Sequence, residues 1–170
     1  MVRYRLVLDP AADDPHIGRW LAALDEVRRD TLKLLVGLPD SVVDRDPGDG
    51  DDTIGTILYH VALVEADWVF SDLLDREAEI GRDLFPADDR GDDGRLSPVL
   101  GETMAQHLDR LSRTRSMVLG ALCSMSPEEF HQVRARSDYD VSADWVVFHL
   151  IDHEVEHRVR LSGLRDAFRT

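Results

Sequence analysis

Apolar residues recur at spacings of three and four in four separate segments of this 170-residue chain, most clearly in the last. The core-facing positions of that segment share one helical face about 80° wide when successive residues are placed about 100° apart. These positions are Val146, Leu150, His153, His157, Leu161, Leu164 and Phe168. The pattern predicts a long amphipathic helix from about residue 142 to about residue 168.

Two earlier segments carry the same periodicity. The first spans residues 15–38 and ends near Gly37 and Pro39, because glycine and proline are typical of the residues that follow a helix. The second spans residues 53–74 and follows a loop rich in proline, glycine and aspartate. Thr53, or the aspartate before it, is the expected N-cap.

A third segment is predicted to begin at Ser97-Pro98, since serine caps helices and proline suits their first turn. Residues 81–97 are rich in glycine, aspartate and arginine, and they predict a long loop that could cover an opening. The loop is therefore expected to separate the second helix from the third.

Shorter elements complete the prediction. Residues 2–8 alternate weakly between polar and apolar and predict a short extended N-terminal arm. A turn of helix is expected at residues 126–129, while residues 131–140 are expected to be irregular or to pair with the arm. Four helices of roughly 20–27 residues joined by loops favour an all-α four-helix bundle, in a single domain of residues 1–170.

Charge and composition narrow the classes of function. The chain has 34 acidic residues against 20 lysines and arginines, a net charge of −14, so its surface repels phosphate and no nucleic-acid partner is expected. No apolar run approaches the roughly 20 residues that span a bilayer, and the N-terminus lacks a long apolar stretch, so neither membrane insertion nor export is expected. The single cysteine, Cys123, cannot form an internal disulfide, which fits a cytoplasmic protein.

Two histidines lie in the middle of the apolar face of the last helix, one turn apart. Because side chains four residues apart are neighbours, two such imidazoles could share one metal ion. The segment His153-Glu154-Val155-Glu156-His157 matches the H-E-x-x-H pattern, and in a zincin-like hydrolase Glu154 would face a bound water as general base. Two imidazoles are too few for a catalytic zinc site, which usually has three protein ligands.

A third ligand must therefore come from another helix. His60 is the best candidate, because it lies on the flank of the apolar stripe of the second helix. His149 is the alternative, but three ligands on one helix would span about 12 Å along its axis, too far for one ion. The remaining histidines share no face with these and are expected at the surface: His16, His107 and His131.

Two interpretations without a metal also fit the pattern. His153 and His157 could form a polar core, neutral and hydrogen-bonded to carboxylates such as Glu65 or Asp67. They could also lie on a solvated face. The spacing of the residues alone leaves the metal site, the polar core and the solvated face open.

Two segments resemble signatures of the DinB-like (DinB/YfiT) superfamily. Residues 53–68, Thr-Ile-Gly-Thr-Ile-Leu-Tyr-His-Val-Ala-Leu-Val-Glu-Ala-Asp-Trp, resemble its second helix, where a histidine is followed by glutamate and an aromatic residue. Residues 149–158, His-Leu-Ile-Asp-His-Glu-Val-Glu-His-Arg, are similar to its fourth-helix motif H-x-x-x-H-E-x-x-H-R-G-Q. The resemblance covers about residues 15–165 and departs at Val159-Arg160, where the family usually has Gly-Gln for close helix packing and a polar contact.

The resemblance implies a four-helix bundle in which His60, His153 and His157 bind a divalent metal, zinc or nickel, and it implies a homodimer. Family members of known activity are thiol S-transferases or maleylpyruvate isomerases that use mycothiol, bacillithiol or glutathione. The implied function is a metal-dependent thiol S-transferase, hydrolase or isomerase that acts on a small electrophile. A metal-binding stress-response module without turnover and a metal-free homodimeric interaction protein are the alternatives. No catalytic or cofactor-binding side chain is assigned.

Overall fold

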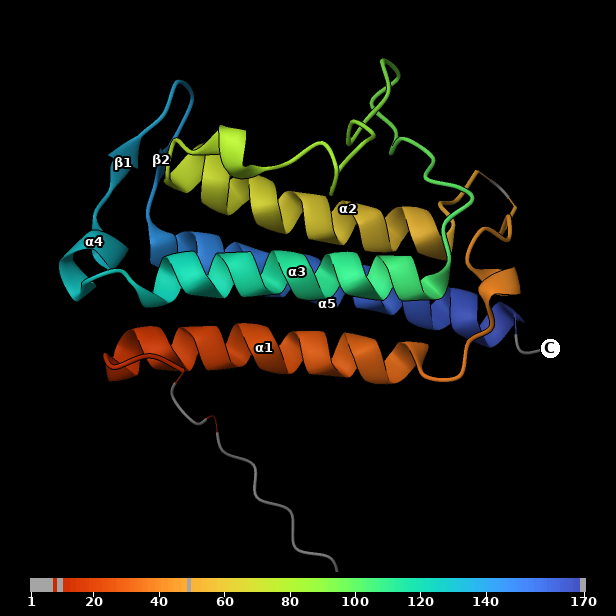
Figure 1. Ribbon diagram of the computed structural model, residues 1–170, viewed down its shortest axis with the longest axis horizontal. Coiled ribbons are helices and arrows are strands. Elements are labelled where there is room, and N and C mark those ends of the chain that lie inside the picture. Colours follow the sequence, from red (N-terminus) through yellow and green to blue (C-terminus); the bar gives the residue numbers. More distant parts are fainter. Residues whose placement is uncertain (1–7, 9–10, 49, 169–170) are drawn as a thin grey trace, which may run out of the picture.

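The computed structural model describes residues 8, 11–48 and 50–168. Four long helices lie side by side and form a bundle (Figure 1), as the sequence predicts. They are α1 (Pro15–Leu35), α2 (Ile54–Asp67), α3 (Met104–Cys123) and α5 (Ala143–Phe168). The arm predicted at residues 2–8 lies, apart from Leu8, outside the described residues.

The ends of the first two helices follow from local chemistry. The side chain of Asp14 accepts hydrogen bonds from the first turn of α1, where Pro15 occupies the first position. Gly37, with φ +79°, follows the end of α1. Thr53 caps α2 by accepting from the backbone N–H of Thr56, which confirms the predicted start. Beyond α2 the chain continues as one π-helical segment, Trp68–Leu73.

The third helix begins later than predicted, and the expected start at residues 97–98 is wrong. Thr103 and Gln106 form a reciprocal capping box, in which each side chain accepts from the other residue's backbone N–H. Gly101, with φ +84°, turns the chain just before this cap. The capping box satisfies the free N–H groups of the helix end, so α3 starts there and not at the earlier serine and proline.

Short elements fill the connections. The predicted helical turn is α4 (Pro127–His131), capped by Ser126. Residues of the 131–140 segment form a small antiparallel hairpin, in which β1 (Arg134–Ala135) pairs with β2 (Asp140–Val141), so the expectation of irregular structure is wrong. Two 3₁₀ turns complete the described elements, Asp40–Val42 and Glu77–Glu79. No described helix is long and apolar enough to cross a membrane.

The apolar core contains a fully buried arginine–glutamate cluster with one member from each long helix. Its members are Arg28 of α1, Glu65 of α2, Arg115 of α3 and Glu154 of α5. Each is between 2% and 5% exposed. Both arginines contact both glutamates, at N–O distances of 2.5–3.0 Å. The cluster is neutral overall and joins all four helices at one level of the bundle.

Candidate metal centre

Three imidazoles from two helices converge beside the arginine–glutamate cluster. His60 comes from α2, and His153 and His157 come from successive turns of α5. The Nε2 atoms of His60 and His153 lie 3.1 Å apart, and one nitrogen from each of the three rings lies within 4.8 Å of the others. His60 and His157 are buried, and His153 is half-buried. The structure thus brings together the three residues that the sequence pointed to.

The spacing of these nitrogens fits a divalent metal. Zinc binds histidine nitrogen at about 2.0–2.1 Å, so two such ligands lie at most about 4.2 Å apart, close to the 4.8 Å within which these nitrogens lie. Nδ1 of His157 is buried and has no hydrogen-bond partner among the described residues. An unpaired buried nitrogen is costly in a dry core, and a bound ion would satisfy it. Three convergent histidines are therefore able to hold an ion here.

A carboxylate from the long loop orients the first histidine. Oδ1 of Asp89 lies 2.5 Å from Nδ1 of His60. Burial opposes the charge of Asp89, but the hydrogen bond and the electrostatic attraction to His60 outweigh it, so the pKa of Asp89 lies below its usual value. An ionised Asp89 accepts a hydrogen bond from Nδ1–H of His60, and Nε2 of His60 then faces His153. Carboxylate–histidine pairs of this kind are typical behind metal ligands.

Burial keeps the two histidines of α5 neutral at physiological pH. Burial, together with repulsion from His157 and His60, lowers the pKa of His153 to about 3. Burial likewise lowers the pKa of His157 to about 4, with repulsion from His60 as the next cause. Neutral imidazoles carry the free lone pairs that a metal requires, so no proton must be removed near pH 7.

The other histidines do not join this site. His149 stacks on Trp145, with ring centroids 5.1 Å apart and planes 7° apart, and also contacts Trp68. His107, expected at the surface, is fully buried. That prediction is wrong because His107 follows Met104 by three residues and precedes Leu111 by four, on the core-facing stripe of α3. The remaining two are exposed, as predicted: His16 and His131.

The carboxylates suggested by the sequence do not serve the imidazoles. Glu154 and Glu65 are both held by the buried arginines, so Glu154 cannot face a metal-bound water as a zincin-like general base would. The carboxylate that does bond an imidazole is Asp89, and its partner is His60 and not His153 or His157, for which the polar-core interpretation expected Glu65 or Asp67. Nothing in the sequence pattern singles out Asp89, since it lies in a loop with several other aspartates and has no periodicity to place it.

The residues that depart from the family motif are accommodated without loss of packing. Val159 is 69% exposed, so its side chain does not separate α5 from a neighbouring helix. Arg160 donates to Asp52 at 2.7 Å, in the loop before α2. The preceding Arg158 contacts Asp30 of α1 at 3.3 Å.

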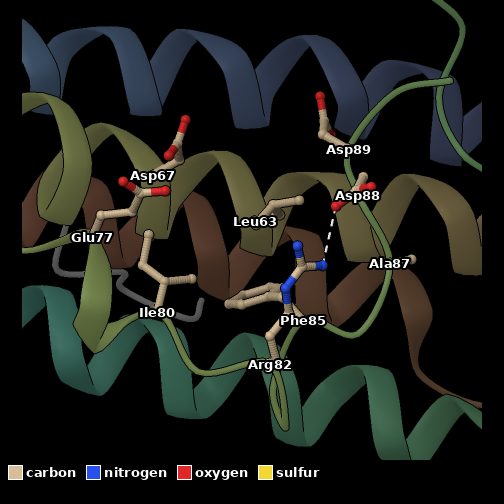
Figure 2. Close-up of a pocket in the computed structure, with 9 residues that line it drawn as sticks. All are labelled: Leu63, Asp67, Glu77, Ile80, Arg82, Phe85, Ala87, Asp88 and Asp89. Atoms are coloured by element: carbon tan, nitrogen blue, oxygen red, sulfur yellow. Dashed lines mark hydrogen bonds and ion pairs between the residues drawn. The ribbon is translucent and has the colours of Figure 1, made fainter. Parts of the chain in front are cut away.

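Two pockets flank Asp89. The first, of about 280 Å³, is lined by His60 and His157 together with the side chains or backbone of Asp52, Arg90, Gly94, Arg95, Leu96 and Arg160. The second, of about 270 Å³, has an acidic rim and an apolar floor, and Figure 2 shows Asp67, Glu77 and Asp89 around it. Of these two pockets the first, here called the arginine pocket, is lined by histidines of the cluster, so it is the one that opens onto the candidate centre.

A four-helix bundle with three convergent imidazoles, from its second and last long helices, defines a class of helical proteins with a histidine site suited to a divalent metal. Comparison with known families identifies this class more closely. The chain belongs to the DinB superfamily, whose family model matches residues 23–159.

A solved structure supports the same fold. The chain is similar to a conserved protein from Enterococcus faecalis, with a TM-score of 0.69 and 16% sequence identity. The similarity covers 86% of this chain and 92% of the other. At this identity the likeness shows the fold alone. No curated protein matches the chain.

Proposed function

We propose that the protein binds a divalent metal, zinc or nickel, through His60, His153 and His157 and is a metal-dependent thiol S-transferase, or a related hydrolase or isomerase, acting on a small electrophile. The observation that carries the proposal is the convergence of three imidazole nitrogens within 4.8 Å of one another inside the bundle. Membership of the DinB superfamily supports it, because the family members of known activity use low-molecular-weight thiols.

Each residue of the site has a definite part in this proposal. A bound divalent ion supplies Lewis acidity, which favours the thiolate form of a low-molecular-weight thiol such as mycothiol or bacillithiol. His153 and His157 supply neutral donors, and Asp89 fixes the tautomer of His60. The arginine pocket beside His60 and His157 offers space for the small molecule.

Metal analysis of the purified protein tests the binding step. We expect about one equivalent of zinc or nickel in the wild type and little in the double variant His153→Ala/His157→Ala. His149→Ala is the matched control, because His149 lies one turn before His153 on the same helix but stacks on Trp145 outside the cluster. Equal metal content in all three proteins would overturn the proposed site.

Turnover assays separate the proposed enzyme from its alternatives. The metal-loaded protein is expected to conjugate a small electrophile with mycothiol, bacillithiol or glutathione. Bound metal without turnover with any of the three thiols would instead indicate a metal-binding module of the stress response. Metal-free protein whose thermal stability does not respond to chelator would indicate an interaction module.

We also expect a homodimer, in keeping with the family resemblance. Light scattering on the eluted protein measures the mass directly, against 19.2 kDa for one chain. A mass of one chain at micromolar concentration would contradict this expectation.

A further inference from the structure

The geometry points to the arginine pocket as the binding site for an anionic group, a carboxylate or a phosphate, on the small molecule that approaches the histidine centre. This inference deepens the proposed function and rests on it for the identity of the reacting end. Its own evidence is the placement of Arg90, Arg95 and Arg160 around the same pocket as His60 and His157.

The three guanidinium groups come from two separate parts of the chain. Arg90 and Arg95 belong to the loop between α2 and α3, and Arg160 lies one turn beyond the centre on α5. Arg95 donates to the carbonyl oxygen of Gly50, and Arg90 donates to that of Gly94 at 2.9 Å. Each of these bonds uses one of five N–H donors, so both groups keep donors for a ligand while backbone contacts hold them in place.

The charges of the pocket are not balanced by its own carboxylates. Asp52 is the single acidic residue among the described residues that line it, and it is paired with Arg160 at 2.7 Å. Asp89 contacts Arg90 at 3.3 Å from outside this lining, but it also serves His60. Arg95 makes no ion pair with any described carboxylate. The pocket is therefore net positive before any ion is bound at the histidines.

The positive charge of the pocket is opposite in sign to the net charge of the whole molecule. The chain carries a net charge of −14, yet three of its 20 lysines and arginines line one small pocket. The neighbouring pocket has the opposite character: Asp67, Glu77, Asp88 and Asp89 line it, and its one arginine, Arg82, is paired with Asp88 (Figure 2). Planar guanidinium groups are suited to bidentate binding of carboxylate and phosphate, so the pocket selects an anion.

Isothermal titration calorimetry with succinate and with inorganic phosphate tests the inference, and uncharged succinamide serves as the ligand control. The wild-type protein as purified is expected to bind at least one anion and to ignore succinamide. Arg95→Gln and Arg160→Gln are each expected to weaken that binding about tenfold, the loss typical of one hydrogen bond to a charged group. Arg82→Gln, in the same loop but on the other pocket, is the matched control and should bind like the wild type.

The tighter of the two anions identifies the ligand group. If neither anion binds, or if Arg95→Gln and Arg160→Gln bind as tightly as Arg82→Gln, the inference is wrong. Arg95 is exposed, so Arg95→Gln carries the test even where Arg160→Gln, which frees Asp52, fails to fold.

Metal content of the same samples separates the two ideas. Arginine-dependent anion binding by protein that takes up no metal would sustain the pocket and overturn the proposed function. Metal-loaded protein that binds neither anion would leave the metal site standing and overturn the pocket.

Discussion

The bundle carries two polar clusters at neighbouring levels of the same helices, and they differ in what their atoms contact. In the arginine–glutamate cluster every carboxylate and guanidinium faces an opposite charge. In the histidine cluster, His60 has a carboxylate partner, Asp89, whereas Nδ1 of His157 has no hydrogen-bond partner among the described residues. All charged groups of the first cluster are paired with one another, whereas the second cluster borders a pocket and has a ring nitrogen without a partner among the described residues.

The comparison shows that the face of the helix on which a residue lies determines whether it joins the ion-pair cluster or the histidine cluster. His153 and Glu154 are adjacent on α5, so their side chains point about 100° apart. His153 therefore contacts the imidazoles of α2 and of its own helix face, whereas Glu154 contacts the arginines of α1 and α3. A motif written as H-E-x-x-H is thus divided here between two sites with different partners.

The largest expected effect comes from breaking the arginine–glutamate cluster. Glu154→Ala would leave Arg28 and Arg115 buried with one carboxylate between them, and we expect a loss of about 3–5 kcal/mol in the free energy of unfolding. Urea denaturation measures this loss. Glu156→Ala is the control, because Glu156 is exposed on the same helix and should change stability by less than about 0.5 kcal/mol. Similar losses in both variants would show that the arginine–glutamate cluster contributes no more to the free energy of unfolding than an exposed glutamate does.

The next effect concerns the histidine cluster and the metal proposed to bind there. At a free zinc concentration about 100 times the dissociation constant, binding to the folded chain should stabilise it by about 2.7 kcal/mol. Chelator should remove this gain from the wild type and from His149→Ala. His153→Ala/His157→Ala should show no gain to remove. A chelator effect that persists in the double variant would place the ion elsewhere.

A smaller effect is expected at the carboxylate behind the histidine cluster. Asp89→Asn keeps the shape of the side chain but removes the charge that fixes His60, and we expect metal affinity to fall about 10–100-fold. Competition with a chromophoric chelator measures the affinity. Asp88→Asn is the control, because the neighbouring Asp88 is exposed and contacts Arg82. Unchanged affinity in Asp89→Asn would show that Asp89 does not position the ligand.

The features of the two clusters that follow helical periodicity could be predicted from the sequence. The stripe of α5, which holds His153 and His157, and the position of His60 in α2 followed from helical periodicity. Asp89 did not, because a loop has no period and its partner lies 29 residues away. The arginine–glutamate cluster was equally hidden, since each of its four members comes from a different helix and no pattern in the sequence pairs Glu65 or Glu154 with the two arginines. The start of helix α3 is a different case, because the Thr103–Gln106 capping box is a local pattern and the prediction chose the competing Ser97-Pro98 start instead.

The two clusters should also respond to acid in different pH ranges in the metal-free protein. The pKa values of about 3 for His153 and about 4 for His157 lie below the value near 6.5 in the unfolded chain. At pH values between the folded and unfolded pKa, the unfolded chain therefore binds more protons than the folded protein. Stability should therefore fall by about 2 kcal/mol for each of these two histidines as the pH drops from 7 to 4.5. For Glu65, burial raises the pKa, but Arg115 and Arg28 outweigh it, so its contribution is lost only below its ordinary value of 4.5.

Urea unfolding at a series of pH values measures both ranges. His153→Ala/His157→Ala should lose most of the slope between pH 7 and 4.5 and keep the loss below 4.5. A residual slope is expected, because burial also lowers the pKa of His107. An unchanged slope in the double variant would assign the upper range to other groups.

The smallest effect is expected at a residue that touches neither cluster. Val159 replaces the glycine usual in the family motif, and its side chain is 69% exposed on α5. Because the side chain packs against no neighbouring helix, restoring glycine gains no contact and loses helix propensity, so Val159→Gly should destabilise the protein by about 0.4 kcal/mol. Metal affinity, measured by the same chelator competition, should stay within twofold of the wild type. A tighter metal site in Val159→Gly would show instead that the backbone of this turn sets the spacing of His153 and His157, and the two clusters would then be coupled through α5.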